Sequence, residues 1–188
     1  MSNHTLSVLV QNVSGVLARV SGLISRRGFN IESLAVGPTE DPGISRITLS
    51  VDVDDLVLEQ LTKQLNKLVE VLKIVELEHT AVHRELILIK VAADVDSRGR
   101  VLEILQLFQG AKAVDLSPET ITIEAVGSPE KLAALMQLLD PFGIRELVQS
   151  GMVAIGRGSR SISERTQRPV AVPAPASAIK SIASATAG

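Results

Sequence analysis

The chain has 188 residues and a formal net charge of −2; 45% of the residues are apolar, but only three are aromatic, all of them Phe. Such a chain can form one ordinary domain or two small ones around cores of Val, Leu, Ile and Ala, which argues against global disorder. The low charge and the scarcity of rings disfavour a nucleic-acid binder, and the sequence has no cysteine for disulfides, thiolate metal sites or cysteine nucleophiles.

Targeting features of the sequence favour a cytoplasmic protein. The apolar runs are far shorter than the roughly 20 residues that a membrane-spanning helix needs. The segment MSNHTLSVLV has no basic stretch followed by a long apolar block and a small-residue cleavage site. The lack of cysteine fits a reducing compartment. We therefore expect a protein that binds neither membranes nor nucleic acid.

The first half of the chain predicts the order strand, helix, strand, strand, helix, strand. Residues 46–53 alternate between apolar and polar side chains, which is typical of a sheet covered on one side only. Ser14 is expected to cap the first helix and Gly28 to end it, and Asp-Pro-Gly at 41–43 predicts a tight turn. The expected elements are strands at 6–10, 31–36, 46–53 and 71–77, a helix at 15–27, and a second helix that begins at Asp54 and Asp55 and buries Leu58, Leu61, Leu65 and Leu68.

The second half of the chain repeats this order. Ser128 is expected to cap a helix that has Pro129 at its first position, and Gly110 is expected to end the helix before it. The expected strands are 86–92, 113–116, 120–126 and 144–148, with a short one at 152–155. The apolar stripes of the two helices are Val101, Leu102, Leu105 and Phe108, and Leu132, Leu135, Met136 and Leu139.

This repetition predicts an α+β fold of two ferredoxin-like βαββαβ units, residues 1–80 and 81–158. Each unit would carry two helices on one face of its sheet and leave the other face free to cover a partner. From about residue 159 the sequence turns polar and basic and then rich in Pro, Ala and Ser, so we expect a disordered tail at 159–188. A solvated tail is a simpler interpretation of the basic run than binding to an acidic partner.

Two turns of the first unit combine glycine with small polar residues, and close packing would bring them together. The first amides of a helix lack partners and favour an anion, and Gly15 has no Cβ to keep a carboxylate away. Asn12 begins this turn, and Asn30, after the other turn, can both donate and accept hydrogen bonds. With Val, Leu and Ile residues nearby, these features suit an α-amino acid. The alternative is that both are ordinary turns that bind nothing.

Catalytic and metal-binding constellations cannot be assembled from the sequence. His79 and His83 have the four-residue spacing of a zinc-binding helix, but they fall at the junction of the units, where neither a helix nor acidic ligands are expected, so a linker pair is the simpler interpretation. There is no phosphate loop or dinucleotide fingerprint. RNA-recognition modules share the βαββαβ order, but they stack bases on aromatic side chains that the expected strands lack. We expect no catalysis by this chain alone.

Several longer stretches resemble one family. LSVLV, NVSGVLARV and RRGFNIESLAVGPTE, all within residues 6–40, closely resemble the ACT domain at the start of acetolactate synthase (acetohydroxyacid synthase) small subunits, and LEQLTKQLNKLVEVLKI continues the match. HRELILIKVAA and LVQSGMVAIGRG look like the C-terminal domain of that family. The resemblance covers about residues 5–158, and the run SRRGFNIESLAVGPTE is long and specific.

The resemblance implies a regulatory subunit of the thiamine-diphosphate-dependent transferase that condenses pyruvate in valine, leucine and isoleucine biosynthesis. It implies activation of the catalytic large subunit and feedback inhibition by valine, or by leucine in some members. No cofactor or metal is expected on this chain; thiamine diphosphate, Mg²⁺ and FAD are expected on the catalytic partner. In the family two ACT domains pair as a homodimer with the effector between them, so Asn12, Gly15 and Val16 of one chain would face Asn30 and Ile31 of its twin.

Two other functions stay open at this point. The chain could be a different amino-acid-sensing ACT protein that regulates another enzyme or transcription, although no helix-turn-helix pattern lies outside the two units. It could also be an assembly module whose turns bind nothing. Calorimetry with valine separates this last alternative from the others.

Overall fold

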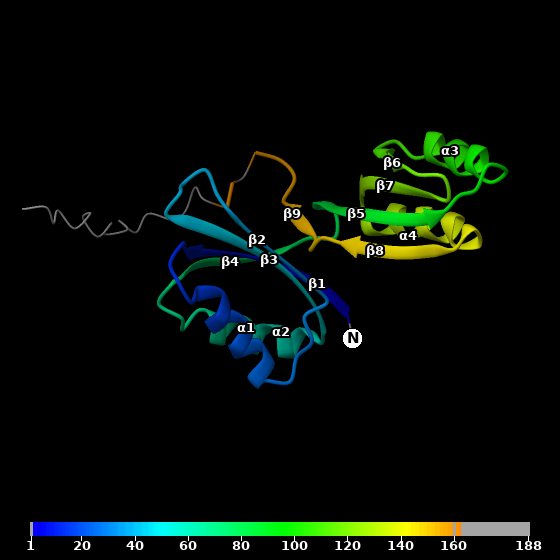
Figure 1. The fold of residues 1–188 in the computed structure, drawn as a ribbon. Coiled ribbons are helices and arrows are strands. Elements are labelled where there is room, and N and C mark those ends of the chain that lie inside the picture. The colour runs from blue at the N-terminus through cyan, green and yellow to red at the C-terminus, as the bar shows by residue number, and fades with distance from the viewer. Residues whose placement is uncertain (1, 160, 163–188) are drawn as a thin grey trace, which may run out of the picture.

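The computed structural model describes residues 2–159, 161 and 162, so most of the predicted tail lies outside the described residues. The chain forms two α+β units joined by a short connection between Leu77 and Val82 (Figure 1). Each unit is an antiparallel sheet with two α-helices on one face, which confirms the predicted ferredoxin-like architecture. Within this part of the chain, no helix is both long enough and apolar enough to cross a membrane.

The first unit has its elements in the predicted order. They are β1 (Ser2–Gln11), α1 (Val16–Arg26), β2 (Ser33–Pro38), β3 (Ile44–Val53), α2 (Asp55–Leu65) and β4 (Val71–Leu77). The strand order in the sheet is β2-β3-β1-β4. β1 pairs with β3 along its whole length, from Ser2 opposite Val53 to Gln11 opposite Ile44, and with β4 on its other side. β2 and β4 are therefore the edge strands.

The two ends of α1 test two predictions made from the sequence. Gly28 has a φ of 76°, and its amide donates to the carbonyl oxygen of Ser25 at 2.9 Å, so the helix ends as predicted. The prediction that Ser14 caps the helix is wrong. The N-cap is Gly15, with a φ of 85°, and no side chain accepts a hydrogen bond there. The chain enters the helix through a left-handed residue, a conformation that glycine adopts at little cost.

The second unit repeats the pattern and adds two short elements. The elements are β5 (Val82–Ala92), α3 (Arg98–Leu107), β6 (Ala111–Leu116), β7 (Thr120–Gly127), α4 (Pro129–Leu139), a 3₁₀ turn η1 (Asp140–Phe142), β8 (Ile144–Gln149) and β9 (Val153–Ile155). The strand order is β6-β7-β5-β8, and β9 pairs with the first residues of β5. The sequence predicted β9 as a strand but not its partner, and it did not predict η1.

The start of α4 confirms the predicted cap. The Ser128 hydroxyl accepts from the amide of Lys131 at 3.4 Å, and Pro129 occupies the first helical position. The carboxylate of Glu130 also lies in this first turn. Its own backbone amide and then the Ser128 hydroxyl hold the pKa of Glu130 below its usual value. The N-terminus of α4 therefore already has an anion of its own.

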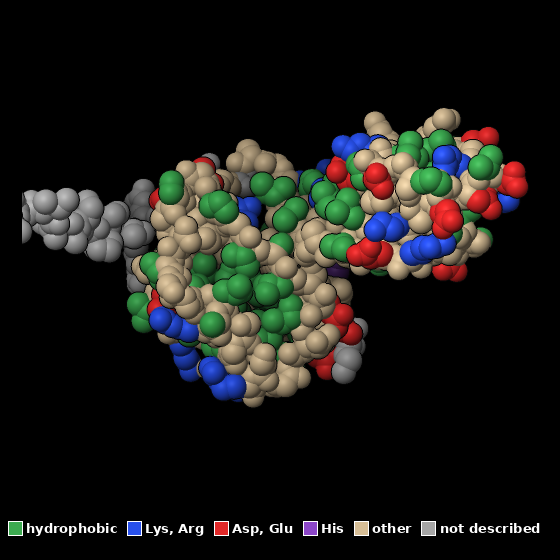
Figure 2. Space-filling model, viewed as in Figure 1, with side chains coloured by type: hydrophobic (Ala, Val, Ile, Leu, Met, Phe, Trp, Pro, Cys, Tyr) green, Lys and Arg blue, Asp and Glu red, His purple; other side chains and the backbone are tan. Residues whose placement is uncertain are grey.

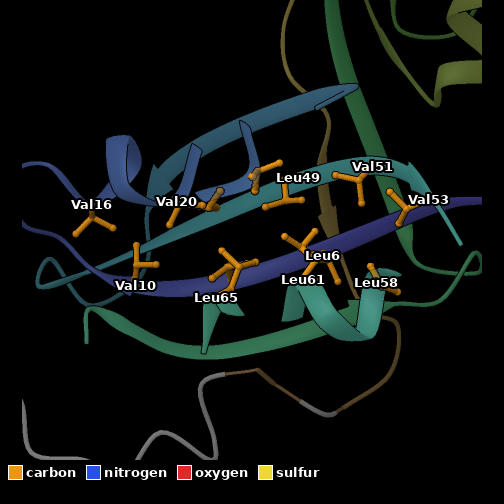
Figure 3. Packing of buried hydrophobic residues seen from close by; sticks show 13 residues of the cluster. Leu6, Val10, Val16, Val20, Leu49, Val51, Val53, Leu58, Leu61 and Leu65 are labelled. Carbon is orange, nitrogen blue, oxygen red and sulfur yellow. The ribbon is translucent and has the colours of Figure 1, made fainter. Parts of the chain in front are cut away.

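Each unit is built around a separate apolar core. Figure 3 shows the first core, in which side chains of α1 and α2 pack onto β1 and β3. Its buried members are Leu6, Val8, Val10, Val16, Val20, Ile24, Ile47, Leu49, Val51, Val53, Leu58, Leu61 and Leu65. The buried members of the second are Ile87, Ile89, Val91, Ala93, Val101, Leu105, Ile121, Ile123, Ala125, Leu132, Leu135 and Leu139. The two clusters share no residue, so each unit has the core of an independent domain.

The two sheets differ on the face away from their helices. In the first sheet this face is buried: Ser7, Thr48 and Ser50 are only 1%, 3% and 2% exposed. β9 lies against it, in contact with β1 (Figure 1). In the second sheet, Leu86 and Leu88 remain more than a third exposed on this face. The prediction of one-sided cover is thus wrong for the first sheet, because another part of the chain lies over its polar face.

Candidate functional site

The turn between β1 and α1 presents backbone amides without a side-chain cap. Gly15 has the left-handed backbone described above, and α1 has no acidic residue in its first turn. Within the described residues, hydrogen-bond partners are found for the amides of Val13 and Val16, with Val13 oxygen 3.5 Å from the Val16 nitrogen, but not for those of Ser14 and Gly15. Such amides at the positive end of a helix suit a carboxylate.

Asn12 connects this turn to the loop between β2 and β3. Its side-chain nitrogen donates to the carbonyl oxygen of Pro42 at 2.9 Å, and its backbone amide donates to the carbonyl oxygen of Gly43 at 2.8 Å. The loop is the predicted Asp-Pro-Gly turn, closed by a hydrogen bond from the Gly43 amide to Asp41 Oδ1 at 2.8 Å. Two donors of Asn12, its side-chain nitrogen and its backbone amide, therefore hold the turn in place.

Arg19 is a cation at this turn that the sequence reasoning missed. It lies one helical turn after Gly15, and its Nη2 would be 3.8 Å from a Cβ placed on Gly15. The guanidinium also forms an ion pair with Glu70, which comes just before β4, and the Arg19 side chain is about half exposed. The spacing of four residues after Gly15 is the signal that could have revealed it, because residues four apart share one face of a helix.

The side chains of Val16 and Ile31 pack against the first core. Val16 is 5% exposed and belongs to the first core, so only its backbone can reach a ligand at the turn. Ile31 is half-buried and packs against the same core. Of the predicted pocket residues, these two are thus the ones that also hold the fold together.

Asn30 has a partner that the sequence reasoning also missed. Its side-chain nitrogen donates to Glu32 Oε1 at 2.6 Å, and both side chains are exposed. The carboxylate fixes the orientation of the amide, so the Asn30 oxygen and its second N–H point in defined directions. Glu32 follows Asn30 by two residues, and this spacing alone does not predict a hydrogen bond between the two side chains.

The two predicted halves of the site lie at opposite ends of α1. Asn12, Gly15 and Val16 are at its beginning, and Asn30 and Ile31 follow its end. An 11-residue helix separates them by roughly 16 Å along its axis. The expectation that packing brings both turns together within one chain is therefore wrong. Their meeting across two chains stays a prediction.

Apolar side chains gather on the first unit near these turns. Figure 2 shows them between the strands and α1 of Figure 1. Leu23, Phe29 and Leu34 pack against the core but remain partly exposed, and Leu17 and Val36 are 42% and 47% exposed. β2, which carries Leu34 and Val36, is an edge strand. This side of the unit thus combines open backbone groups with apolar surface.

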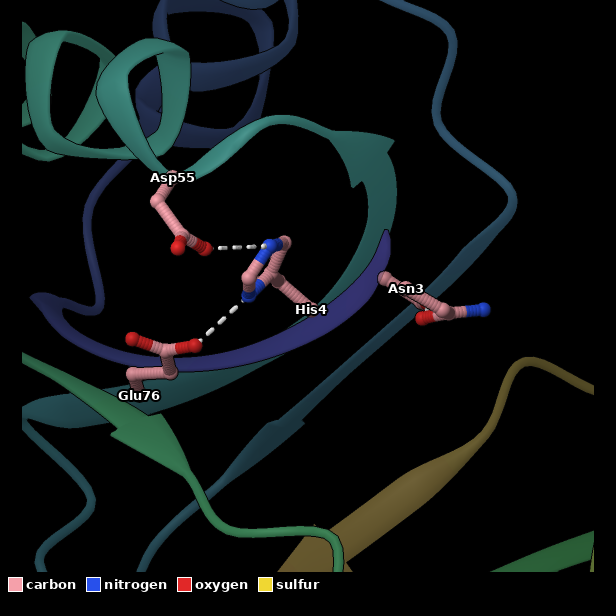
Figure 4. Close-up of polar contacts among 5 residues, drawn as sticks. Asn3, His4, Asp55 and Glu76 are labelled. Atoms are coloured by element: carbon pink, nitrogen blue, oxygen red, sulfur yellow. Dashed lines mark hydrogen bonds and ion pairs between the residues drawn. The ribbon is translucent and has the colours of Figure 1, made fainter. Parts of the chain in front are cut away.

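A buried histidine forms a second polar cluster in the first unit. His4 on β1 lies between two carboxylates, with Nδ1 2.7 Å from Glu76 Oε1 and Nε2 3.5 Å from Asp55 Oδ1 (Figure 4). His4 is 9% exposed, whereas Asp55 is almost fully exposed. The cluster links β1, β4 and the start of α2. Asp55 and Glu76 offer His4 no hydroxyl or thiol to activate as a nucleophile, so the cluster is better explained as a structural contact than as a catalytic site.

The other two histidines, His79 and His83, lie at the junction of the two units. His79 lies in the turn between the units and His83 in β5, so neither stands on a helix, in agreement with the linker interpretation. Among the residues that the structure describes, no group of three or more His, Asp and Glu side chains could hold a metal ion.

Comparison with known proteins identifies relatives along nearly the whole described chain. Residues 6–73 match the family model of the AHAS small subunit-like ACT domain, and residues 84–158 match that of the small subunit of acetolactate synthase. The acetolactate synthase small subunit of Mycolicibacterium smegmatis is 61% identical over 160 residues, which cover 85% of this chain and 94% of that protein. The probable acetolactate synthase small subunit of Archaeoglobus fulgidus is 48% identical over 157 residues, covering 84% of this chain and 98% of that protein.

A solved structure has the same arrangement of both units. The crystal structure of an acetolactate synthase small subunit from Thermotoga maritima superposes with a TM-score of 0.78 at 37% sequence identity. The match covers 85% of this chain and all of that chain. The resemblance that the sequence suggested is thereby confirmed over both units.

Proposed function

We propose, since this chain belongs to the family of acetolactate synthase small subunits, that it regulates an acetolactate synthase large subunit by raising its activity and by making it sensitive to valine. The observation that carries the valine-sensing part of the proposal is the uncapped turn at Gly15, which offers backbone amides and the nearby Arg19 guanidinium to a carboxylate. The catalytic chemistry belongs to the large subunit, which would hold thiamine diphosphate, Mg²⁺ and FAD.

The effector site is formed by two chains in this proposal. Neither turn encloses a ligand by itself, and roughly 16 Å separates them along α1. The edge strand β2 and the apolar surface around Leu34 and Val36 favour pairing of two first units side by side. The carboxylate of valine would bind at Gly15 and Arg19 of one chain. Its ammonium group would bind at Asn30 of the twin, with Ile31 beside its isopropyl group.

The regulation follows from linkage between two binding events. Valine favours one arrangement of the paired first units, and the large subunit in its active form favours another. Each ligand then weakens the binding of the other by the same factor, on the order of 5- to 150-fold for typical allosteric couplings. Leucine could replace valine, because the polar contacts are made by groups that all α-amino acids share.

Reconstitution with a large subunit tests the proposal. The chain is mixed with an acetolactate synthase large subunit, and acetolactate formation is measured with and without valine. We expect higher activity than for the large subunit alone and a loss of this gain at saturating valine. Unchanged activity on mixing would contradict the regulatory role. Activation without any response to valine or leucine would contradict only the effector.

Replacing Glu32 with Ala is expected to weaken valine binding although Glu32 need not touch valine. The variant loses the hydrogen bond that orients the Asn30 amide. A net hydrogen-bond contribution of about 0.5–1.5 kcal/mol corresponds to a loss of about 2- to 13-fold in affinity. Calorimetry with valine measures the change, and Glu103→Ala, at an exposed acidic position on α3, is the control. Equal affinities for both variants would show that Glu32 has no role in binding.

A further inference from the structure

The segment that follows β8 leaves the second unit and contacts the first. We call residues 151–157 the inter-unit strap. The amide of Met152 donates to Ser33 Oγ at 2.7 Å, a hydrogen bond between residues 119 positions apart in the sequence. Met152 and Ala154 are 7% and 6% exposed, so their side chains are buried. The strap therefore has a specific contact with the beginning of β2.

Gly151 makes this contact unusually close. A Cβ placed on Gly151 would overlap the carbonyl oxygen of Leu34, and it would lie 2.5 Å from the carbonyl carbon of Leu34 and 2.9 Å from the amide nitrogen of Ala35. These are backbone atoms, which cannot rotate away as a flexible side chain could. Only glycine fits here. The backbone of the strap and the backbone of β2 thus touch without an intervening side chain.

The other part of the strap is fixed to the second unit. β9 pairs with the start of β5, with Ala154 opposite His83. The Arg157 Nε donates to the carbonyl oxygen of Thr80 at 2.5 Å, in the connection between the units. Just before the strap, Ser150 and Leu86 exchange two hydrogen bonds of 2.9 and 3.0 Å. The strap is therefore held to β5 on both sides of its contact with β2.

The contact point lies directly after the predicted effector turn. Ser33 follows Asn30 and Ile31 by three and two residues, and it is the first residue of β2. Its neighbour Leu34 packs against the first core through its side chain, while its carbonyl group faces Gly151. Because residues 30–31 are separated from Ser33 by a single residue, a displacement of this turn is expected to reach the start of β2. The backbone contact with Gly151 would transmit that displacement to the strap.

We propose that the inter-unit strap couples the effector turn to the second unit through the contacts of Gly151 and Met152 with the start of β2. The proposal rests on the proposed function, in which valine binds at Asn30 and Ile31. Effector binding shifts the start of β2, and the strap passes this shift to β9 and β5. Gly151 and Ser33 are then positioning residues for regulation rather than residues of the effector pocket.

Two variants and two controls test this inference in the full chain. Ser33→Ala removes the hydrogen-bond acceptor of Met152, and Gly151→Ala forces the strap away from Leu34. Gly156→Ala lies in the same strap and Gly37→Ala in the same strand, but a Cβ at either position meets nothing within 4 Å. The affinity for valine is measured by calorimetry with the chain alone and with the chain bound to the large subunit. The ratio of the two affinities is the coupling factor.

We expect both test variants to keep the valine affinity of the isolated chain within about threefold, well below the loss of about 10- to 150-fold that removing a charge-assisted contact in the pocket would cause. The coupling factor should fall by about 2- to 30-fold, more for Gly151→Ala than for Ser33→Ala, and stay unchanged in both controls. If Gly151→Ala fails to fold, as circular dichroism would reveal, Ser33→Ala alone decides.

Two outcomes would overturn the inference. A coupling factor in the folded test variants that equals that of the controls would make the strap a purely structural connection. A loss of valine affinity in the isolated variant chains, larger than about tenfold, would place Ser33 and Gly151 in the pocket itself. Failure of the proposed function is recognised separately, because the unmodified chain would then show no coupling between valine and the large subunit.

Discussion

Replacing Gly15 with Asp is expected to abolish inhibition by valine in the reconstituted enzyme while activation by this chain persists. The new carboxylate would stand at the amides of the β1–α1 turn and close to Arg19, where the proposal places the carboxylate of valine. It would both occupy that position and repel the ligand. The loss of one charge-assisted contact, about 1.5–3 kcal/mol, corresponds to about 10- to 150-fold weaker valine binding.

The positive φ of Gly15 requires a control for backbone strain. Any residue with a Cβ is strained at a φ of 85°, but Asn tolerates this conformation better than most and matches Asp in size without its charge. Gly15→Asn therefore separates strain from charge. We expect Gly15→Asn to bind valine with intermediate affinity and Gly15→Asp to bind it with the lowest.

Calorimetry and the reconstituted assay together decide the assignment. A Gly15→Asp chain that still activates the large subunit and remains sensitive to valine would remove Gly15 from the effector site. A chain that neither activates nor binds would indicate a folding defect, which thermal unfolding of both variants detects. Equal affinities of the Asp and Asn variants would attribute the effect to strain and not to the carboxylate.

The periodicity of apolar residues predicts the main helices and strands of this fold. It does not predict which other segments of the chain pack over the sheets. The alternation at 46–53 placed Ile47, Leu49, Val51 and Val53 correctly in the core. It also suggested an open polar face, whereas Thr48 and Ser50 are buried. A polar residue on a strand is predicted to face solvent. The sequence pattern does not indicate that a segment far away in the chain, the strap, covers this face in the folded protein.

In the candidate site, too, the sequence predicts features that depend on neighbouring residues but not those that depend on distant ones. Gly15 and Gly28 were found as turn residues because a left-handed backbone restricts the residue type. Ser14 was misjudged as the cap because serine is a favoured N-cap residue, whereas the left-handed backbone that makes Gly15 the cap is not visible in the sequence. The partners Arg19 and Glu32 were missed because charged residues are common on surfaces, and only their contacts in the structure distinguish them.

The second large effect is expected from a fragment of residues 1–80, which should bind valine but activate the large subunit poorly. The buried members of the first core all lie between Leu6 and Leu65, so the fragment retains the complete core and both predicted turns. It lacks the strap, and the face thereby opened carries Leu9 together with Thr48 and Ser50, whose hydroxyls water can satisfy. The fragment also lacks the second unit, which we expect to provide contacts with the large subunit.

A full-length variant with an unfolded second unit distinguishes the effect of losing that unit from the effect of shortening the chain. Ile123→Asp places an unpaired carboxylate among fully buried side chains of the second core, a change that costs several kcal/mol and unfolds that unit. Val95→Asp adds the same charge at a position that is 86% exposed and is the matched control.

The measured quantities are valine affinity by calorimetry and activation of the large subunit by titration. If the second unit provides even one main contact, worth about 2 kcal/mol, activation by the fragment and by Ile123→Asp requires about 30-fold more protein than activation by Val95→Asp. Valine affinity should be similar for all three, because both half-sites lie in the first unit. Full activation by the fragment at the concentration that suffices for the intact chain would assign both regulation and activation to the first unit alone. The strap would then have nothing to couple, since the signal from Asn30 and Ile31 would reach the large subunit without passing through β9.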